Sequence, residues 1–155
     1  MKLNVVAVCV AFFLCIGSIS GCQNEKMTSA DFNDDKFAPG QVWFFYARPG
    51  EDEATLTVQK VEKYDKLGVV VHISVDGIAL KNSRSSDGVT KTLGHLPLSK
   101  KSLEESIGDL IGNEGKIGDL EGYRTWKKEF DADKAGVFTI TLKDILDGFE
   151  QAFNQ

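Results

Sequence analysis

The chain has 155 residues, of which 42% are hydrophobic and 26% are charged, and its formal net charge is −5 at pH 7. This length and composition suit a single globular domain. An acidic chain lacks the basic surface that attracts phosphate backbones or anionic bilayers, so its charge argues against nucleic acid as a partner. Any attachment to a membrane must then come from something other than charge.

Residues 1–21 predict a cleaved export signal. Lys2 is followed by an apolar run from Leu3 to Ile16 that only Asn4 interrupts. A bilayer-spanning helix needs about 20 apolar residues, whereas this run has the length of the apolar region of a signal peptide. Small residues follow the run, as a cleavage site requires. The alternatives are an uncleaved membrane anchor and an ordinary secretory signal.

Residues 19–22, ISGC, resemble the lipobox of bacterial lipoproteins, with Ile19 where Leu is usual. The resemblance implies that the Cys22 thiol is acylated and that cleavage after Gly21 makes Cys22 the first residue. Lipid chains would then hold the protein to a membrane of the cell envelope, each buried methylene contributing about 0.8 kcal/mol. Asp directly after the acylated Cys disfavours sorting to the outer membrane, and Gln23 stands there instead. In a host with two membranes, the resemblance therefore implies the outer membrane, facing the periplasm.

The cysteine count agrees with this interpretation. Cys9 and Cys15 lie in the predicted signal, so Cys22 would be the one thiol of the mature chain. No disulfide can then form within that chain, and acylation removes the thiol from redox chemistry.

Residues 22–38 predict an acylated N-terminus and a flexible tether, because they are polar and show no period. Asp31, Asn33 and Asp35 have the spacing with which a calcium loop begins, but Lys36 stands where such a loop needs Gly. We therefore predict no metal site there. Residues 39–155 are expected to form one globular domain.

The first half of this domain predicts strands. Residues 42–47 alternate with both faces partly buried, and a turn follows at Arg48–Glu51. The returning strand shifts phase before Val61, which indicates a bulge near Gln59 and Lys60. Residues 67–75 give the strongest alternation, with Val69, Val71, Ile73 and Val75 on one face and Val70, His72 and Ser74 on the other.

Further strands are expected beyond this alternation. Asp76 and Gly77 predict a hairpin turn that leads into a strand from Ile78 to Leu80. After a polar loop, residues 89–93 predict one more strand.

The last third predicts helices. Residues 102–111 show helical spacing, and Ser102 with Glu105 fits a capping box. Two further helices are expected over residues 119–134 and 141–155, with a short strand at residues 135–140 between them. The predicted fold is α+β: an antiparallel β-meander of four to five strands, followed by two to three C-terminal helices packed on one side of the sheet.

Known catalytic motifs are absent from the sequence. His72 and His95 are its two histidines, and no Cys follows residue 22, so a closed zinc site of Cys and His cannot form. We predict no metal and no cofactor. His72 in mid-strand and His95 on an expected loop both suit structural or surface roles, although a Ser–His–Asp site assembled in space stays open.

Aromatic side chains offer another signal of function, because they can form a sugar platform or a partner hot spot. The alternative is that they pack in the core. With the histidines, the candidate binding residues are Trp43, Phe45, Tyr46, His72, His95, Tyr123 and Trp126.

Three functions are compatible with these patterns. The absence of catalytic motifs and the expected anchor favour a non-catalytic module that binds or inhibits another envelope protein, for example an immunity or inhibitor protein. The second is an accessory or structural lipoprotein of an envelope assembly. The third is a hydrolase whose site would include His72 or His95, and changing either residue would then abolish turnover.

Overall fold

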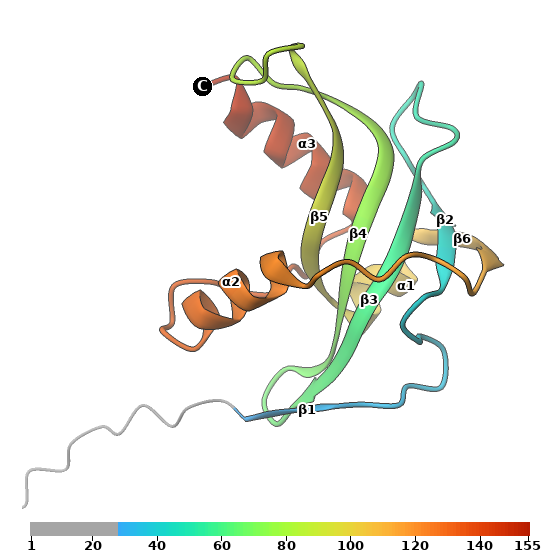
Figure 1. Ribbon diagram of the computed structural model, residues 1–155, viewed down its shortest axis with the longest axis vertical. Helices are drawn as coiled ribbons and strands as arrows, with labels where there is room; N and C mark the ends of the chain where they lie inside the picture. Colours follow the sequence, from blue (N-terminus) through green and yellow to red (C-terminus); the bar gives the residue numbers. More distant parts are fainter. Residues whose placement is uncertain (1–27) are drawn as a thin grey trace, which may run out of the picture.

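The computed structural model describes residues 28–155 as an α+β fold with a six-stranded antiparallel sheet and three helices (Figure 1). The predicted class is confirmed, while the sheet has more strands than the four to five expected. None of the helices in the described range is long and apolar enough to cross a bilayer. The predicted signal peptide and Cys22 lie outside the described residues.

The sheet contains the predicted meander, extended at one edge. Strands β2 to β5 pair consecutively, β6 returns beside β2 to give the order β5-β4-β3-β2-β6, and β1 pairs with β3. The elements are β1 (Ser29–Asp31), β2 (Val42–Phe45), β3 (Thr55–Tyr64), β4 (Gly68–Lys81), β5 (Val89–Ser99), α1 (Lys100–Glu104), β6 (Ile107–Gly112), α2 (Glu121–Phe130) and α3 (Leu142–Phe153).

Strands β3 and β4 form the centre of the sheet, and two sequence predictions about them are confirmed. Val58 pairs with Ile73 and Lys60 pairs with His72, so Gln59 is the extra residue of a β-bulge. Val71, Ile73 and Val75 of β4 lie in the main core, whereas Val70 belongs to a second cluster on the other face.

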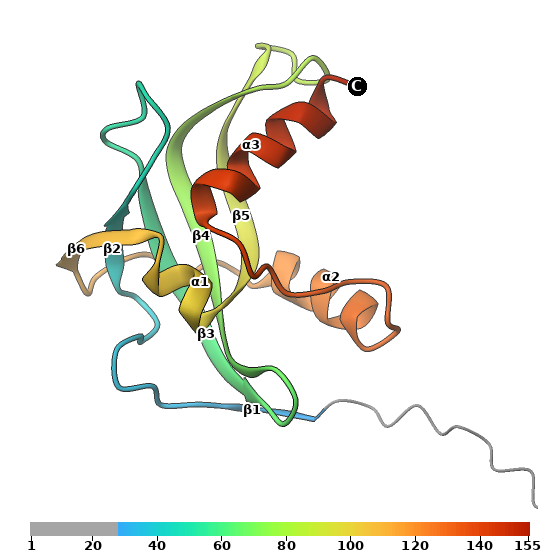
Figure 2. The same ribbon diagram turned by 180° about the vertical axis from the view of Figure 1, so that it is seen from behind.

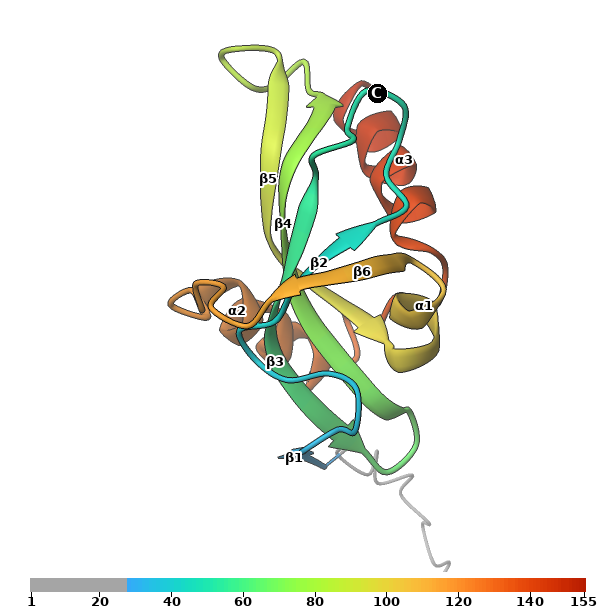
Figure 3. The ribbon, with the colours of Figure 1, turned by 90° about the vertical axis from the view of Figure 1, so that its right-hand side faces the viewer.

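Helices cover both faces of the sheet, which corrects the prediction that they pack on one side. Figures 1 and 2 show the two faces, and Figure 3 shows α2 on one side of the sheet with α1 and α3 on the other. The main core joins the sheet to α1 and α3 and includes Leu56, Leu98, Leu103, Leu142, Ile145 and Leu146. The second cluster joins it to α2 and contains Tyr64, Val70, Trp126 and Phe130.

The predicted hairpin turn at Asp76 and Gly77 is wrong, because β4 runs through both residues. The β4–β5 register shifts between Asp76 and Leu80, and Gly77 has a φ of 77°. A Cβ at Gly77 would lie 3.1 Å from the Cα of Ala54, so glycine here permits a bulge and a close approach of two chains. An Asp-Gly pair in a sequence is therefore compatible with either a hairpin turn or a β-bulge.

The predicted helix over residues 102–111 is also wrong. A single short helix, α1, begins after Ser99, whose side chain caps it, and β6 follows. Ile107 and Leu110 pair with Phe45 and Trp43 of β2. Apolar residues three and four apart fit either structure, and the main-chain bonds offered by β2 outweigh a helical pattern that Gly108 already weakens.

The ordered domain begins earlier than Pro39. Within the range predicted as a tether, β1 pairs with β3, and Phe37 is 1% exposed in the main core. Lys100 also forms ion pairs with Asp34 and Asp35. The described part of that range is therefore part of the fold, because one buried Phe and paired polar groups hold a segment that has no period.

Strand β5 continues past Leu93, where the sequence predicted its end, and includes His95 and Pro97. Proline is tolerated because β5 is an edge strand, where a missing N–H removes no ladder bond. The short strand expected at residues 135–140 is reduced to one bridge between Phe138 and Leu98.

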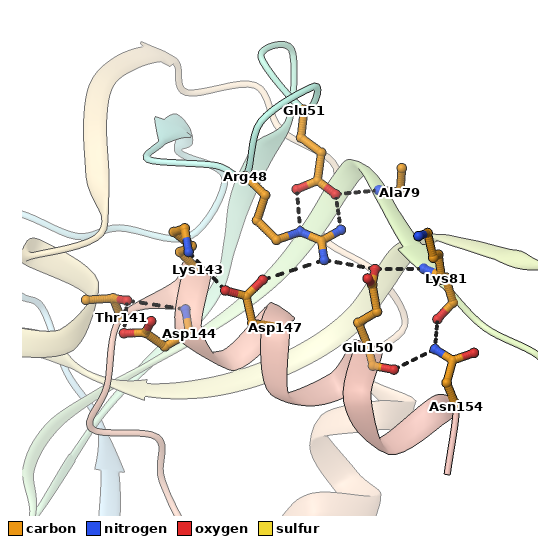
Figure 4. Close-up of polar contacts among 10 residues, drawn as sticks. All are labelled: Arg48, Glu51, Ala79, Lys81, Thr141, Lys143, Asp144, Asp147, Glu150 and Asn154. Carbon is orange, nitrogen blue, oxygen red and sulfur yellow. Dashed lines mark hydrogen bonds and ion pairs between the residues drawn. The ribbon is translucent and has the colours of Figure 1, made fainter.

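An ion-pair network attaches α3 to the strands (Figure 4). Arg48 follows β2. It donates hydrogen bonds to Glu51 and, at 2.9 Å, to Glu150 of α3. Both carboxylates also accept main-chain N–H groups of β4, from Ala79 and Lys81 respectively. The hydrogen bonds that Arg48 donates to the two carboxylates raise its own pKa. Arg48 in turn lowers the pKa of Glu51, although burial of this carboxylate acts in the opposite direction.

Candidate functional site

The most unusual polar arrangement lies between α2 and the sheet. Helix α2 begins after Leu120, which has a left-handed φ of 60°, a conformation that costs about 1 kcal/mol or more for a residue with a side chain. A Cβ at Gly122 would lie 2.7 Å from the Cβ of His95. The first turn of α2 therefore contacts His95 closely, and only glycine fits at that point.

Beneath α2, a carboxylate–histidine chain crosses three strands. Nε2 of His72 lies 3.1 Å from Oε2 of Glu62, and Nδ1 of His72 lies 3.0 Å from Nε2 of His95. Glu62 and His72 are 4% and 0% exposed, while His95 is partly exposed. The chain thus runs from a buried carboxylate on β3, through β4, to a side chain on β5 that reaches the surface.

Other groups fix both ends of this chain. The hydroxyls of Tyr64 and Tyr123 each donate to Glu62 at 3.0 Å, and Ser29 of β1 donates to it at 3.2 Å. The ring of Trp126 lies 4.9 Å from that of His72, and its Nε1 donates to the carbonyl of Gly136 at 2.8 Å. Strand β1 and helix α2 therefore both contribute to holding the carboxylate and the rings.

The electrostatics assign the charges along the chain. Burial opposes ionisation of Glu62, but hydrogen bonds from His72, Tyr123 and Tyr64 lower its pKa to about 2. Burial lowers the pKa of His72 against the effect of Glu62, and burial and His72 together lower the pKa of His95 to about 4. At pH 7 the carboxylate is charged and both imidazoles are neutral.

These charges determine where the imidazole protons lie. Ionised Glu62 can only accept, so His72 donates to it through Nε2–H. Because His72 is neutral, its Nδ1 carries no proton and accepts from Nε2–H of His95. Nδ1 of the neutral His95 is then the unprotonated nitrogen at the end of the chain.

His95 opens into a cleft of about 770 Å³ between the sheet and the segment that leads into α2. The cleft is lined by Gln59, Ser74, Asp76, Thr92, Leu93, Gly94, His95, Lys116, Gly118, Asp119, Leu120, Glu121, Gly122, Tyr123 and Thr125. At the bulge, Gln59 donates to Ser74 and to the Lys116 carbonyl, and it accepts from the N–H of Gly118 at 2.7 Å. One amide therefore fixes the segment that forms a wall of the cleft.

Comparisons with known proteins do not assign this arrangement to a family. No family model, curated protein or solved structure matches the chain. Among residues 28–155, no group of three or more His, Cys, Asp or Glu side chains is placed to hold a metal ion.

The structure separates the candidate binding residues into two groups. His72, His95, Tyr123 and Trp126 form one cluster, of which His95 and Tyr123 line the cleft. Trp43 and Phe45 instead pack in the main core, and Tyr46 is 65% exposed beyond β2. His95 lies on a strand, which corrects the expected loop.

Sequence analysis missed Glu62, although a signal for it exists. With the bulge at Gln59, the alternation of β3 places Lys60, Glu62 and Tyr64 on the face opposite Val61. His72 occupies the same face of the sheet, opposite Lys60 in register. Glu62 lies diagonally across from His72, within reach of a long side chain.

Acid is expected to destabilise the fold through the histidines before Glu62 is protonated. Their folded pKa values lie below the ordinary 6.5, so the unfolded chain binds more protons and the free energy of unfolding falls as the pH falls below 6.5. With a folded pKa of about 4, His95 alone accounts for a loss of about 2 kcal/mol between pH 7 and pH 5. Glu62 acts in the same direction below pH 4.5.

Urea unfolding at pH 7, 6 and 5 measures this dependence. His95→Gln should make it shallower, because the variant lacks one of the two titrating imidazoles. An unfolding midpoint that stays constant from pH 7 to pH 5 would contradict the assignment of neutral buried histidines.

Proposed function

We propose that the protein is a lipid-anchored cell-envelope protein that binds, and thereby captures or inhibits, another envelope protein through the cleft beside His95. The observation that carries the proposal is the cleft itself, a hollow of about 770 Å³ with a mixed polar and apolar lining, on a chain with an expected anchor. Ligand sites are concave and contain a few convergent polar groups, as this cleft does. Its volume suits a few side chains or a loop of a partner.

The lining of the cleft supports recognition of a polar segment. Hydroxyl groups come from Ser74, Thr92 and Thr125, and carboxylates come from Asp76, Asp119 and Glu121. Such groups give direction and specificity to hydrogen bonds with a partner. The Gln59 bonds hold the wall at residues 116–118 in place, so little ordering is required on binding.

Site-specific crosslinking in cells tests the cleft as the binding surface. A photoreactive amino acid at Thr92 or Thr125, both exposed at the cleft, should give one dominant adduct with an envelope protein. Glu104 of α1, exposed on the opposite face of the sheet, is the matched control position and should give none. Equal adducts from both faces, or none from the cleft, would contradict the proposal. Adducts with several assembly components would favour the accessory role.

The anchor is tested separately with Cys22→Ala. If Cys22 carries the lipid, this variant should incorporate no labelled fatty acid and should leave the membrane fraction, because no acyl chain remains to enter the bilayer. Cell fractionation and labelling in parallel with the unaltered chain measure both effects. Retention of label on the variant would refute acylation at Cys22.

A further inference from the structure

The carboxylate–histidine chain has a geometry that suits proton transfer as well as structural support. Among the described residues, every buried side-chain nitrogen or oxygen has a hydrogen-bond partner. Nε2 of His95 is bonded to His72, so Nδ1 is the remaining ring nitrogen of a residue that lines the cleft. An acceptor with no proton of its own is thus held at a hollow large enough for a ligand.

We propose that His95 is a catalytic base whose Nδ1 takes a proton from a hydroxyl group or a water molecule in the cleft, with His72 and Glu62 as positioning residues. The proposal rests on the cleft being the ligand site proposed above. It adds a chemical activity, hydrolysis or transfer of an acyl group, to a site that binding alone would explain.

Each proton in this step has a defined destination. The O–H bond of the ligand breaks and an Nδ1–H bond forms on His95, while the Nε2 proton of His95 passes across 3.0 Å to Nδ1 of His72. His72 then carries the positive charge and keeps its Nε2–H on Glu62, 3.1 Å away. Glu62 stabilises this charge while burial of His72 opposes it, so the charged state is short-lived.

The deprotonated oxygen can attack an ester carbonyl. A C–O bond forms to the attacking oxygen and the C–O bond to the leaving group breaks. The proton returns along the same chain to the leaving group or to solvent, and both histidines regain their starting tautomers. No oxidant or reductant is required. General bases contribute about 10²- to 10⁴-fold to a rate, and the contribution is largest when the pKa of the base lies near the working pH.

The pH dependence of this activity follows from the groups that surround the chain. They are Lys60, Glu62 and Tyr64 of β3, Asp76 of β4, Tyr123 of α2, and Lys116, Asp119 and Glu121 around the cleft. Burial keeps His95 neutral until the pH approaches about 4. The base is therefore available well below pH 6.5, where an exposed imidazole is already half protonated.

Nitrogen-detected NMR of the full-length protein in detergent tests the tautomers without any substitution. The chain has two histidines, so two sets of ring signals have to be distinguished. At pH 7 both rings should carry their proton on Nε2, with Nδ1 unprotonated. A proton on Nδ1 of His95 would overturn the proposal.

Hydrolysis of p-nitrophenyl acetate by the same full-length protein tests the activity. His95→Gln is the informative variant, because its amide NH₂ can still donate to His72 while no ring nitrogen remains to accept a proton. We expect its protein-dependent rate to fall at least about 10-fold. Glu62→Gln should cause a smaller loss, and Glu104→Gln on the far face should cause none. For the unaltered protein, the rate constant attributable to His95 should stay level from pH 8 to 5.5 and fall towards pH 4.

The outcomes distinguish this proposal from the binding function. Equal rates for the unaltered protein and folded His95→Gln would overturn the catalytic base, and crosslinks from Thr92 and Thr125 would leave the binding function intact. A 10-fold loss confined to His95→Gln, together with the expected tautomers, supports the base whether or not a protein partner is captured.

Discussion

Replacing Trp126 with Ala is expected to lower the free energy of unfolding by about 3–5 kcal/mol, the usual range for deleting a buried aromatic side chain. Trp126 is 9% exposed, stacks on Phe130 with ring centroids 4.8 Å apart, and contacts the ring of His72. Its loss leaves a cavity between α2 and the sheet and removes the bond to the Gly136 carbonyl. Denaturant unfolding measures the change.

Tyr46→Ala is the matched control for this variant. Tyr46 is an aromatic side chain that is 65% exposed, so its removal should change stability by less than about 0.5 kcal/mol. Hydrogen exchange should also show that Trp126→Ala opens α2 before the meander, because α2 depends on the smaller of the two cores. A loss below about 1 kcal/mol would show that other contacts hold α2 in place.

Replacing Arg48 with Met is expected to cost about 3 kcal/mol, because the variant leaves buried charge without its partner. The side chains of Arg48 and Glu51 are 13% and 3% exposed. Met keeps much of the packing of the Arg stem, so the loss reports on the charge. The folded-state pKa of Glu51 should rise in the variant, since the Arg48 side chain, together with the N–H of Ala79, lowers it against burial.

Two companion variants sharpen the interpretation of Arg48→Met. Adding Glu51→Gln should recover part of the loss, because the orphaned carboxylate is then neutral. Lys143→Met removes the ion pair with Asp147 on the exposed surface of α3 and should cost less than about 0.5 kcal/mol. Equal effects for Arg48→Met and Lys143→Met would contradict the role assigned to the buried network.

The parts of the fold that the sequence predicted are those with a strong local pattern. Alternation located β4, and a phase shift located the bulge at Gln59. Helical spacing located α2 and α3, where the apolar side chains of residues 142, 145 and 146 are buried in the main core as expected. In these segments local preference and tertiary packing favour the same structure.

The errors arise where distant segments decide the structure. Residues 107–111 have a helical pattern, and only the free edge of β2 makes them a strand. Gly77 could begin a hairpin, and the proximity of Ala54 makes it part of a bulge. Likewise, both histidines were named as candidates, but their contact depends on the register between β4 and β5, which no local pattern specifies.

Strand β1 begins at Ser29, a few residues after the proposed lipid attachment point at Cys22. A fully extended chain advances at most about 3.6 Å per residue, so this interval can span no more than about 25 Å. The domain would therefore be held close to the bilayer and could not extend far from it into the envelope. A partner would have to present its binding segment near the membrane surface, whether it is itself attached to the membrane or is a soluble protein that reaches that surface.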